Sequence, residues 1–377
     1  MQLFFSQNLI NTHAPLQTMK IAIIGAGPAG TFTALNLARN GHAVDIYEEH
    51  EKVGEPLACT GILTKQLEKF MNPKKILVNT VHGARIIAGA HSVDVELGGG
   101  NLVIERVHLD QELAEDCITQ GVRLHKRHRF ESNTGKTLTL KDTKNNQTIT
   151  SEADIIVGAD GPSSAVAKAN GIYTDRRWWI GVQVRADCPN DGLVEFYPTV
   201  GTYAWVVPEN KEIARIGLCA RTNVKPIFDT FLADRKVGKI HSYQGGLIPE
   251  YNPSVQTTKN NIRLVGDAAT QVKATTGGGI VQSMVAGQAL AESIHEHKSY
   301  DRSWKRALGK DLWVHLKLRT MMDRFSAADW EYLIDLFKQD KIRKVIEHHD
   351  RDYPSRFIAS LFLREPRLFY FGRFLLG

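Results

Sequence analysis

The sequence predicts a mixed α/β fold, in which a Rossmann-like domain on a parallel sheet carries an inserted antiparallel sheet and is followed by a helical C-terminal region. Three observations predict this class. A strand–helix–strand pattern occupies 20–49, short β-rich runs separated by turn residues fill 172–258, and a strand followed by a long helix returns at 261–297. With 42% hydrophobic residues among 377, the chain can fill the cores of such a fold.

The segment 20–49 has the pattern of a nucleotide-binding βαβ unit. An apolar run leads into "GAGPAG", a helical stretch follows, and a second apolar run closes at Glu48. Gly25 permits a tight turn, Gly27 lets the backbone approach a pyrophosphate, and Gly30 lets the helix pack closely on the strand. The Glu48 carboxylate stands where it can accept hydrogen bonds from ribose hydroxyls. Together these features predict a dinucleotide site.

Two further segments extend this domain. The segment 101–127 reads as a strand, a helix capped by Asp110, and a second strand, with Arg106 in the connection before the helix. The segment 136–164 reads as a hairpin and then a buried strand that ends at Asp160. Both patterns are typical of further strands and helices of the same nucleotide-binding domain.

A second glycine-rich motif, "GDAATQVKATTGGGI" at 266–280, lies far downstream of the first. A single nucleotide loop holds only the diphosphate and adenosine end of a cofactor, so a longer cofactor such as FAD needs further partners. Asp267 is placed to accept a ribityl hydroxyl, and the triplet at 277–279 can bring backbone N–H groups against the flavin. The following helix N-terminus favours the negative charge of a reduced flavin. This motif therefore predicts a flavin, and because "GAGPAG" with Glu48 is an adenosine-diphosphate site that FMN could not fill, the two motifs together predict FAD rather than FMN.

These segments divide the chain into five expected units. The boundaries are a disordered extension at 1–18, the first part of the FAD-binding domain at 19–171, an antiparallel substrate-binding lobe at 172–258, the second part of the FAD-binding domain at 259–298, and a helical C-terminal region at 299–377.

The order of the motifs resembles a known superfamily. "GAGPAG", Arg106, "GADG" at 158–161 and "GDAA" followed by "TTGGGI" occur as in the flavoproteins related to p-hydroxybenzoate hydroxylase. Within them, "GEPLACTGI" at 54–62 and "YAWVVP" at 203–208 are most similar to the geranylgeranyl reductase family. That family saturates isoprenoid chains of archaeal membrane lipids and of plant and bacterial pigments. The resemblance implies an FAD-dependent reductase of carbon–carbon double bonds in geranylgeranyl chains, with a prenyl lipid as substrate.

The resemblance also implies a set of cofactor contacts. Ala29, Glu48, Arg106, Asp267, Gly279 and Ile280 would contact FAD, and the backbone around Cys59 and Gly61 would lie beside the isoalloxazine. With the residues named above, the predicted cofactor site is Gly25, Gly27, Ala29, Gly30, Glu48, Cys59, Gly61, Arg106, Asp160, Asp267, Gly277, Gly278, Gly279 and Ile280.

The aromatic stretch departs from the family pattern. The family's aromatic-Trp-Phe-Pro stretch is here Tyr203, Trp205, Val207 and Pro208, and the glycine that follows arrives one residue late, at Gly217. Flavin-dependent halogenases carry a similar Trp-x-Ile-Pro stretch on the same fold. Substrate preference is therefore less determined by the sequence than the cofactor is.

Three residues are the catalytic candidates. Tyr203 and Trp205 alternate along a strand and point the same way, so their faces could stabilise positive charge on a substrate carbon by about 0.5–2 kcal/mol. Packing within the sheet explains the same alternation equally well. Cys59 could donate a proton or pack as a small apolar side chain, and packing is the commoner role of a free cysteine. No metal site is expected.

Alternatives remain open at this level. The runner-up is an FAD-dependent aromatic monooxygenase, or a halogenase-like enzyme, of the same fold, and a third reading is a catalytically idle flavin protein that binds lipid. The chain carries no second G-x-G-x-x-G, so a separate nicotinamide domain is not expected. The electron donor is NAD(P)H that docks transiently or a ferredoxin, and the sequence does not choose between them.

Charge and cysteine content bear on partners and location. The net charge is +6, but no zinc-ligand spacing, helix-turn-helix pattern or RNP motif accompanies it, so nucleic acid is not expected as a partner. The four cysteines form no C-x-x-C pair, which suits a reducing compartment and predicts a cytoplasmic protein. The sequence leaves the oligomeric state open.

The tail at 356–377 is aromatic and basic. Four arginines stand against Glu365, and Pro366 interrupts the apolar pattern, so two short apolar-basic pieces are predicted rather than one amphipathic helix. Such pieces could contact an anionic membrane peripherally from the cytoplasmic face. They could equally pack on the protein's own core.

Overall fold

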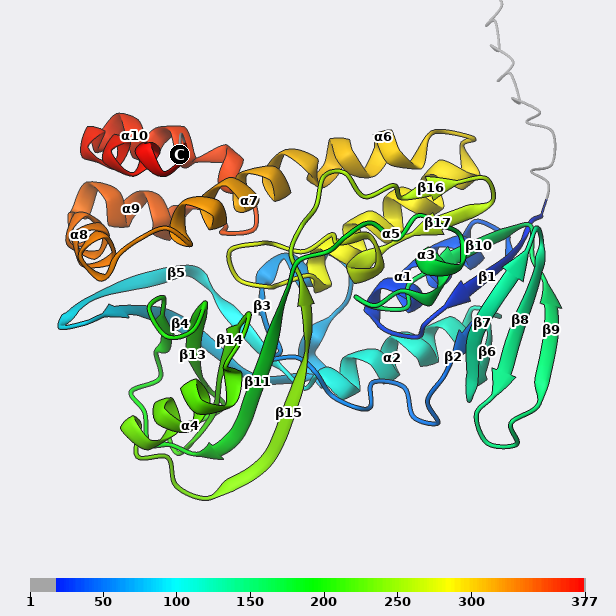
Figure 1. Ribbon diagram of the computed structural model, residues 1–377, viewed down its shortest axis with the longest axis horizontal. Helices are drawn as coiled ribbons and strands as arrows, with labels where there is room; N and C mark the ends of the chain where they lie inside the picture. Colours follow the sequence, from blue (N-terminus) through cyan, green and yellow to red (C-terminus); the bar gives the residue numbers. More distant parts are fainter. Residues whose placement is uncertain (1–17, 376–377) are drawn as a thin grey trace, which may run out of the picture.

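The computed structural model describes residues 18–375, and Figure 1 shows its arrangement. The predicted extension at 1–18 therefore lies outside the described residues except for its last one. The nucleotide-binding layers lie on one side of the molecule, a large sheet lies on the other, and the C-terminal helices cover the β4–β5 end of that sheet. The predicted fold class, a Rossmann-like domain with an antiparallel sheet and a helical C-terminal region, is confirmed.

A six-stranded sheet forms the centre of the nucleotide-binding part. Its order is β16-β17-β10-β1-β2-β6, and all neighbours pair in parallel except β16 with β17. Ile21 and Ile23 of β1 are fully buried on the face that packs against helices, and Ala22 and Ile24 are buried on the other face, which a smaller three-stranded sheet and a short helix cover. The strands are β1 (Lys20–Ile24), β2 (Ala43–Glu48), β6 (Arg123–Lys126), β10 (Ile155–Gly158), β16 (Thr258–Lys259) and β17 (Ile262–Leu264).

Three helices pack beside this sheet. They are α1 (Pro28–Arg39), α2 (Arg106–Thr119) and α5 (Ile280–His295). Helix α1 lies against both of the others, and a side chain at Gly287 of α5 would collide with Thr33 of α1 at 2.5 Å. The small residue thus lets α5, which follows the late glycine motif, lie close to the helix that follows the first one.

The start of α2 corrects two expectations. The helix begins at Arg106 with Glu105 as its cap residue, so Arg106 is not in a connection and Asp110 is not the cap. Asp110 instead lies inside the helix, only 3% exposed, and accepts two hydrogen bonds from Arg106 at 3.0 and 2.8 Å. The charge pair one turn apart replaces the capping role that its sequence position suggested.

The large sheet has eight strands in the order β15-β11-β14-β13-β12-β4-β5-β3. It combines the strands of 172–258 with three strands from earlier in the chain, so the five-unit division stays a prediction. Helix α4 (Val224–Asp234) covers one face of the sheet. The strands are β3 (Ile62–Thr64), β4 (Leu77–Ala88), β5 (His91–Ile104), β11 (Trp178–Asp187), β12 (Val194–Tyr197), β13 (Tyr203–Pro208), β14 (Ile213–Ala220) and β15 (Ile240–Pro249).

A smaller antiparallel sheet of three strands flanks the nucleotide-binding part. It consists of β7 (His128–Thr134), β8 (Thr137–Asp142) and β9 (Thr148–Glu152), and the predicted hairpin joins β8 to β9. Short helical turns complete this half: α3 (Ala165–Ala169), η1 (Lys65–Lys69), η2 (Pro73–Lys75) and η3 (Gly266–Ala269).

The C-terminal region is helical, as predicted. Its elements are α6 (Tyr300–Trp304), η4 (Lys305–Gly309), α7 (Lys310–Met322), α8 (Ala327–Phe337), α9 (Asp340–His348), η5 (Pro354–Arg356), α10 (Ile358–Arg364) and η6 (Pro366–Leu375). The tail forms two short pieces, α10 and η6, as the proline predicted. Leu361, Leu368 and Phe371 are buried against the other C-terminal helices. Of the helices within 18–375, none has the length and apolar character to cross a membrane.

Candidate active site

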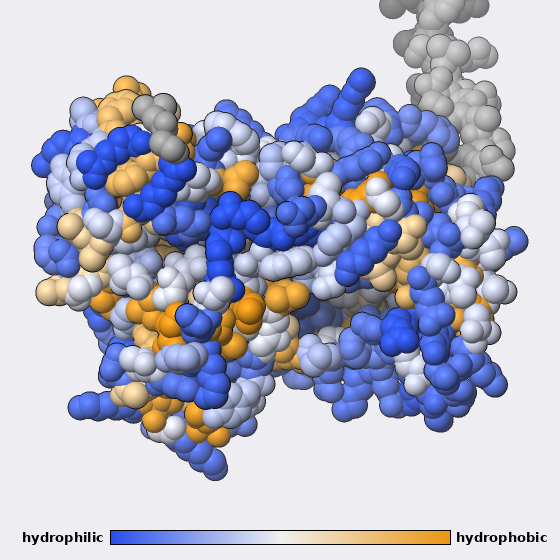
Figure 2. All heavy atoms as spheres, in the orientation of Figure 1, coloured by the Kyte–Doolittle hydropathy of each residue, from blue (hydrophilic) through white to orange (hydrophobic). Residues whose placement is uncertain are grey.

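A cavity of about 370 Å³ lies between the nucleotide-binding part and the large sheet. Figure 2 shows apolar side chains gathered over the upper part of the large sheet, below the C-terminal helices. Most of the predicted site residues meet in this cavity, although they come from segments far apart in the sequence. Those that line it are Gly27, Ala29, Cys59, Gly61, Arg106, Tyr203, Trp205, Asp267, Gly277, Gly278, Gly279 and Ile280.

Four predicted residues stand behind the cavity lining. A side chain at Gly30 would overlap the carbonyl oxygen of Gly25, so both glycines serve the tight packing of the turn. Glu48 accepts a hydrogen bond from the backbone N–H of Ala26 at 2.8 Å, which fixes the same turn. The Asp160 carboxylate turns away from the cavity and accepts hydrogen bonds from residues of the α3 turn.

The first glycine motif leaves room for a phosphate group. A side-chain carbon at Gly27 would meet no atom within 4 Å, although the neighbouring Gly30 position is fully crowded. The N-terminus of α1 begins at Pro28, directly after this open space. Free N–H groups and the positive end of the helix dipole face an approaching anion there. This open cradle fits the diphosphate of a dinucleotide cofactor.

The second motif offers an acceptor that has no partner. Among residues 18–375, the side chain of Asp267 makes no hydrogen bond, and it lines the cavity beside the glycine triplet. Burial raises its pKa to about 6, against weaker opposing effects of Arg106 and Arg176. The residue is half-buried and its carboxylate faces the cavity, where a hydroxyl-bearing ligand can donate to it. Asp267 therefore fits a ribityl hydroxyl of FAD.

The aromatic residues form one wall of the cavity. Tyr203 stacks with Phe196 at a ring-centroid distance of 5.3 Å and lies 5.7 Å from Trp205. The expected common direction of Tyr203 and Trp205 is therefore observed. Burial raises the pKa of Tyr203 well above its usual value, so this phenol keeps its proton. Its hydroxyl lies against Gly277, where a side-chain carbon would approach it to 2.8 Å.

A row of side chains crosses the large sheet at the level of Trp205. The strand register places Phe196, Trp205, Gly217, Gln183 and Gln244 opposite one another on five neighbouring strands. Because Gly217 has no side chain, the indole of Trp205 lies across it. The indole N–H donates to Oε1 of Gln183 at 2.8 Å. The late glycine of the sequence thus makes room for a specific contact between strands β13 and β11.

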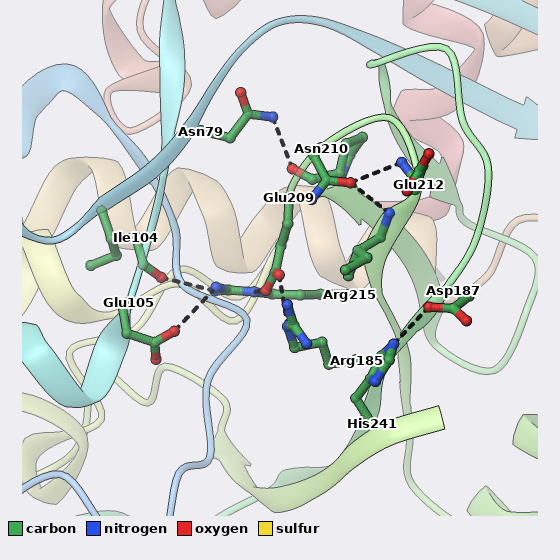
Figure 3. Close-up of polar contacts among 12 residues, drawn as sticks. Asn79, Ile104, Glu105, Arg185, Asp187, Glu209, Asn210, Glu212, Arg215 and His241 are labelled. Carbon is green, nitrogen blue, oxygen red and sulfur yellow. Dashed lines mark hydrogen bonds and ion pairs between the residues drawn. The ribbon is translucent and has the colours of Figure 1, made fainter. Parts of the chain in front are cut away.

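A buried charge network around Arg215, drawn in Figure 3, supports the loop around Cys59 from the large sheet. Arg215 of β14 donates to the carbonyl oxygens of Thr60 and Ile104 at 2.7 and 2.8 Å. Glu209 accepts from Arg215 and from Arg185, each at 2.7 Å, which balances the buried charge. These bonds hold the loop that lines the cavity and connect it to the sheet that carries the aromatic wall.

Cys59 lies in this loop and lines the cavity. Its backbone N–H donates to Oε1 of Gln244 at 3.3 Å, and its sulfur accepts a hydrogen bond from the backbone N–H of Gly61 at the same distance. The side chain is half-buried and lines the cavity. Its sulfur is within reach of a ligand, and its proton is not committed to an acceptor among the described residues.

The glycine triplet has its own buried support. Lys273 accepts from the backbone N–H of Gly277 and donates its own N–H to the carbonyl of Gly278. Its ammonium pairs with Asp352, whose carboxylate also accepts from Thr64 of β3 at 2.8 Å. Asp352 therefore joins the triplet, the large sheet and the C-terminal region at one buried point.

Sequence reasoning missed several residues of the site. Gln183, Gln244, Arg215 and Arg351 surround the cavity or its loop, and none was predicted. A signal existed for Gln183, since it is polar within the apolar first part of the strand "WWIGVQVRAD" and shares the parity of Trp179 and Gly181. The others depend on strands and loops that are remote in the sequence.

Comparisons with known proteins agree with this geometry. The family described as pyridine nucleotide-disulphide oxidoreductase matches residues 19–188. The chain is 28% identical to a digeranylgeranylglycerophospholipid reductase of Methanothrix thermoacetophila over 364 residues, covering 86% of this chain and 93% of the relative. It is 27% identical to the enzyme of the same name from Methanosarcina acetivorans, covering 86% and 90%. The resemblance to geranylgeranyl reductases is confirmed.

Solved structures share the fold. A geranylgeranyl bacteriochlorophyll reductase-like protein of Thermoplasma acidophilum superposes with a TM-score of 0.79 at 19% identity, covering 94% of this chain and 98% of that one. The flavin-dependent halogenase CmlS gives a TM-score of 0.69 at 15% identity, covering 94% and 78%. At these identities the likenesses show a shared fold.

Proposed function

We propose that this chain is an FAD-dependent reductase that saturates carbon–carbon double bonds of geranylgeranyl chains, with membrane ether lipids or related prenyl compounds as substrates. The observation that carries the proposal is the aromatic and aliphatic wall of Tyr203, Trp205 and Phe196, which faces the candidate flavin site across one cavity. An apolar wall of this kind suits a hydrocarbon chain. The names of the similar archaeal reductases support the same substrate class.

The cofactor would be held by the two glycine motifs. The cradle at Gly27 and the α1 N-terminus would take the diphosphate, Asp267 a ribityl hydroxyl, and the triplet before α5 the edge of the flavin ring. Glu48 would accept from the ribose while it fixes the turn through Ala26. When bound, FAD would supply the hydride. The protein's part is to bind, orient and shield the alkene beside it.

The cavity wall would then stabilise charge on the substrate. Saturation of an isolated alkene takes one proton and one hydride, and positive charge develops on carbon as the proton is delivered; the faces of Tyr203 and Trp205 would offer about 0.5–2 kcal/mol of stabilisation to that charge. Tyr203 is a poor proton donor because its pKa is raised by burial. Cys59, half-buried in the loop that lines the cavity, is therefore the better candidate for the proton.

Two electron donors fit this proposal, NAD(P)H that docks transiently and a ferredoxin. Each can be offered to the purified holoprotein without air, and the loss of oxidised-flavin absorbance followed. The donor that reduces the flavin at a rate no slower than turnover is the physiological class. Reduction by neither would count against a reductase.

The tail would provide peripheral contact with an anionic membrane. Leu361, Leu368 and Phe371 fasten it to the C-terminal helices, while Leu363 is 82% exposed and Phe369 is 65% exposed. Arg364 is exposed beside Leu363. Apolar side chains flanked by a free cation suit the headgroup boundary of a bilayer. Both alternatives considered from the sequence would then hold together: one side of the tail packs on the protein, and the other side is exposed and would contact the membrane.

Lipid mass spectrometry tests the proposed reaction. A bacterial host that makes unsaturated archaeal-type ether lipids would be compared with and without this chain, with a Gly27→Ala variant as the flavin-deficient control. We expect the mass of the lipids to rise by one molecule of hydrogen for each reduced double bond. Lipids gaining oxygen or halogen instead would point to the monooxygenase or halogenase alternative, and unchanged lipids would contradict the proposal.

A further inference from the structure

Gln183 lines the cavity and carries a buried hydrogen-bond donor that has no partner among residues 18–375. The residue is only 4% exposed, and it lines the cavity between Gln244 and the aromatic wall. The indole N–H of Trp205 can only donate, so the atom of Gln183 that it contacts must be the oxygen. This fixes the amide orientation and leaves the Nε2 group as the free end.

That Nε2 group is buried and has no hydrogen-bond partner within residues 18–375. Its cross-strand neighbour Gln244 already uses its oxygen to accept from the backbone of Cys59. The nearby lining is otherwise apolar, with Phe196, Val207 and Ile248 on the same side of the sheet. The protein therefore does not supply an acceptor for this donor.

A donor placed in this way needs an acceptor from the ligand. A buried N–H without a partner costs free energy, and a hydrocarbon chain that fills the cavity would exclude water without replacing its hydrogen bond. A water molecule would need two to four polar partners to stay, and the chain of a prenyl group provides none. An oxygen atom attached near the prenyl chain would satisfy the donor.

We propose that Gln183 is a specificity-determining residue whose Nε2 donates a hydrogen bond to an oxygen at the polar end of the prenyl substrate. The inference rests on the proposed function and adds a polar anchor to its apolar site. An ether oxygen and a phosphate-ester oxygen share the required acceptor chemistry. Trp205 acts on the substrate in a second way, because it orients the amide that binds this oxygen.

Binding measurements with three ligands test the anchor. Oxidised holoprotein would be titrated with a geranylgeranyl phosphate, a geranylgeranyl methyl ether and an all-carbon polyene of matching length, and the dissociation constant read from the change in flavin absorbance. In the parent protein, we expect at least one of the oxygen-bearing ligands to bind roughly tenfold more tightly than the hydrocarbon. The ligand with the greater advantage identifies the source of the oxygen.

Two variants separate the anchor from general packing. Gln183→Leu removes the donor, and Gln183→Glu keeps an oxygen for Trp205 while replacing the donor by an acceptor. Both should lose the roughly tenfold preference while hydrocarbon affinity stays within about twofold. Gln288→Leu, an exposed amide on α5, is the matched control and should change nothing. FAD content and melting temperature establish that each variant is folded.

Several results would overturn the inference. The anchor is wrong if both variants keep the preference for oxygen, or if affinity for all three ligands falls equally. Loss of FAD from folded Gln183→Glu would assign the donor to the cofactor instead. If the parent binds none of the three ligands, the proposed prenyl substrate itself fails, and this outcome is distinct from binding without discrimination.

Discussion

Trp205 and Gly217 lie directly opposite each other on strands β13 and β14, and the indole of Trp205 occupies the space that a side chain at Gly217 would fill. A side-chain carbon there would stand 2.5 Å from the indole ring and 2.7 Å from the backbone oxygen of Val182. The position of the glycine therefore decides where the aromatic wall lies. It also decides whether Trp205 can reach Gln183 on the next strand but one.

Gly217→Ala should disturb this wall more than it disturbs the cofactor site. The added methyl group displaces the indole and costs roughly 1–3 kcal/mol of stability, while the glycine motifs proposed to hold the flavin are untouched. We expect FAD content near that of the parent and a prenyl-reduction rate lower by about tenfold or more. Trp205→Phe is the comparison variant, because it removes the N–H that contacts Gln183 without a clash. It therefore separates loss of that hydrogen bond from displacement of the ring. Full activity in Gly217→Ala would contradict the assigned role.

Gly27 and Gly30 give a matched pair of substitutions. Alanine at Gly30 would overlap the carbonyl of Gly25, so we expect a loss of about 3 kcal/mol or failure to fold. Alanine at Gly27 meets no protein atom within 4 Å, so the fold should be retained while the diphosphate is kept away. Circular dichroism and the flavin-to-protein absorbance ratio measure both effects. A yellow, stable Gly27→Ala protein would argue against the cradle.

Asp267→Asn should change both flavin retention and the pH dependence of apoprotein stability. Burial raises the Asp267 pKa from 3.8 to about 6. The folded state therefore holds the proton more tightly, and this group's contribution to stability is lost as pH rises from about 4 to about 6. The free energy of unfolding of the parent apoprotein, measured in urea, should fall over this pH range by at most about 1.4 kcal/mol per pH unit. The variant should lack this fall. Identical pH profiles for the two apoproteins would exclude this assignment.

Asp267→Ala tests the proposed ribityl contact, whereas Asp267→Asn tests the charge of the carboxylate. The variant removes the acceptor altogether, and we expect FAD to dissociate roughly tenfold more readily than from the parent. Flavin fluorescence released during dialysis gives the measurement. Asp160→Ala serves as the comparison, since the Asp160 carboxylate bonds to the α3 turn and not to the cavity. That variant should lose stability before it loses flavin.

Leu363 and Phe369 test the proposed membrane contact. Replacing both with Glu should reduce co-sedimentation with anionic vesicles several-fold, because exposed apolar area is lost and negative charge is added. The melting temperature should change little. Leu361→Ala, in the buried face of the same tail, should instead cost about 2–5 kcal/mol and leave vesicle binding by the folded protein intact. Unchanged sedimentation of the double variant would remove the membrane role.

Removal of the tail as a whole would be less informative. Leu368 and Phe371 are buried against other C-terminal helices, and Asp352 just before the tail supports the glycine triplet. We therefore expect truncation after Tyr353 to lower the melting temperature. The two point substitutions avoid this loss because they change only exposed side chains.

The sequence by itself determined the elements whose cause is local. Glycine spacing in "GAGPAG" predicted the turn and the start of α1, because a side chain is sterically excluded at Gly30 and a ligand can approach at Gly27. Alternation predicted that Tyr203 and Trp205 share one face, and Pro366 predicted two pieces in the tail. Each of these features depends on residues within a few positions of one another.

The tertiary structure alone decided the features that depend on register and on remote partners. Arg106 and Asp110 form a buried pair at the start of α2, because the helix begins directly after β5, with Glu105 as its cap residue and Arg106 already in its first turn. Gln183 faces Gly217 and Trp205 only through the pairing of β11, β14 and β13. Pairing between strands is set by the packing of whole sheets, and a shift of one residue would turn Gln183 to the opposite face. The polarity and parity of Gln183 within its strand mark it as unusual, but they do not identify the residues that it faces on the neighbouring strands.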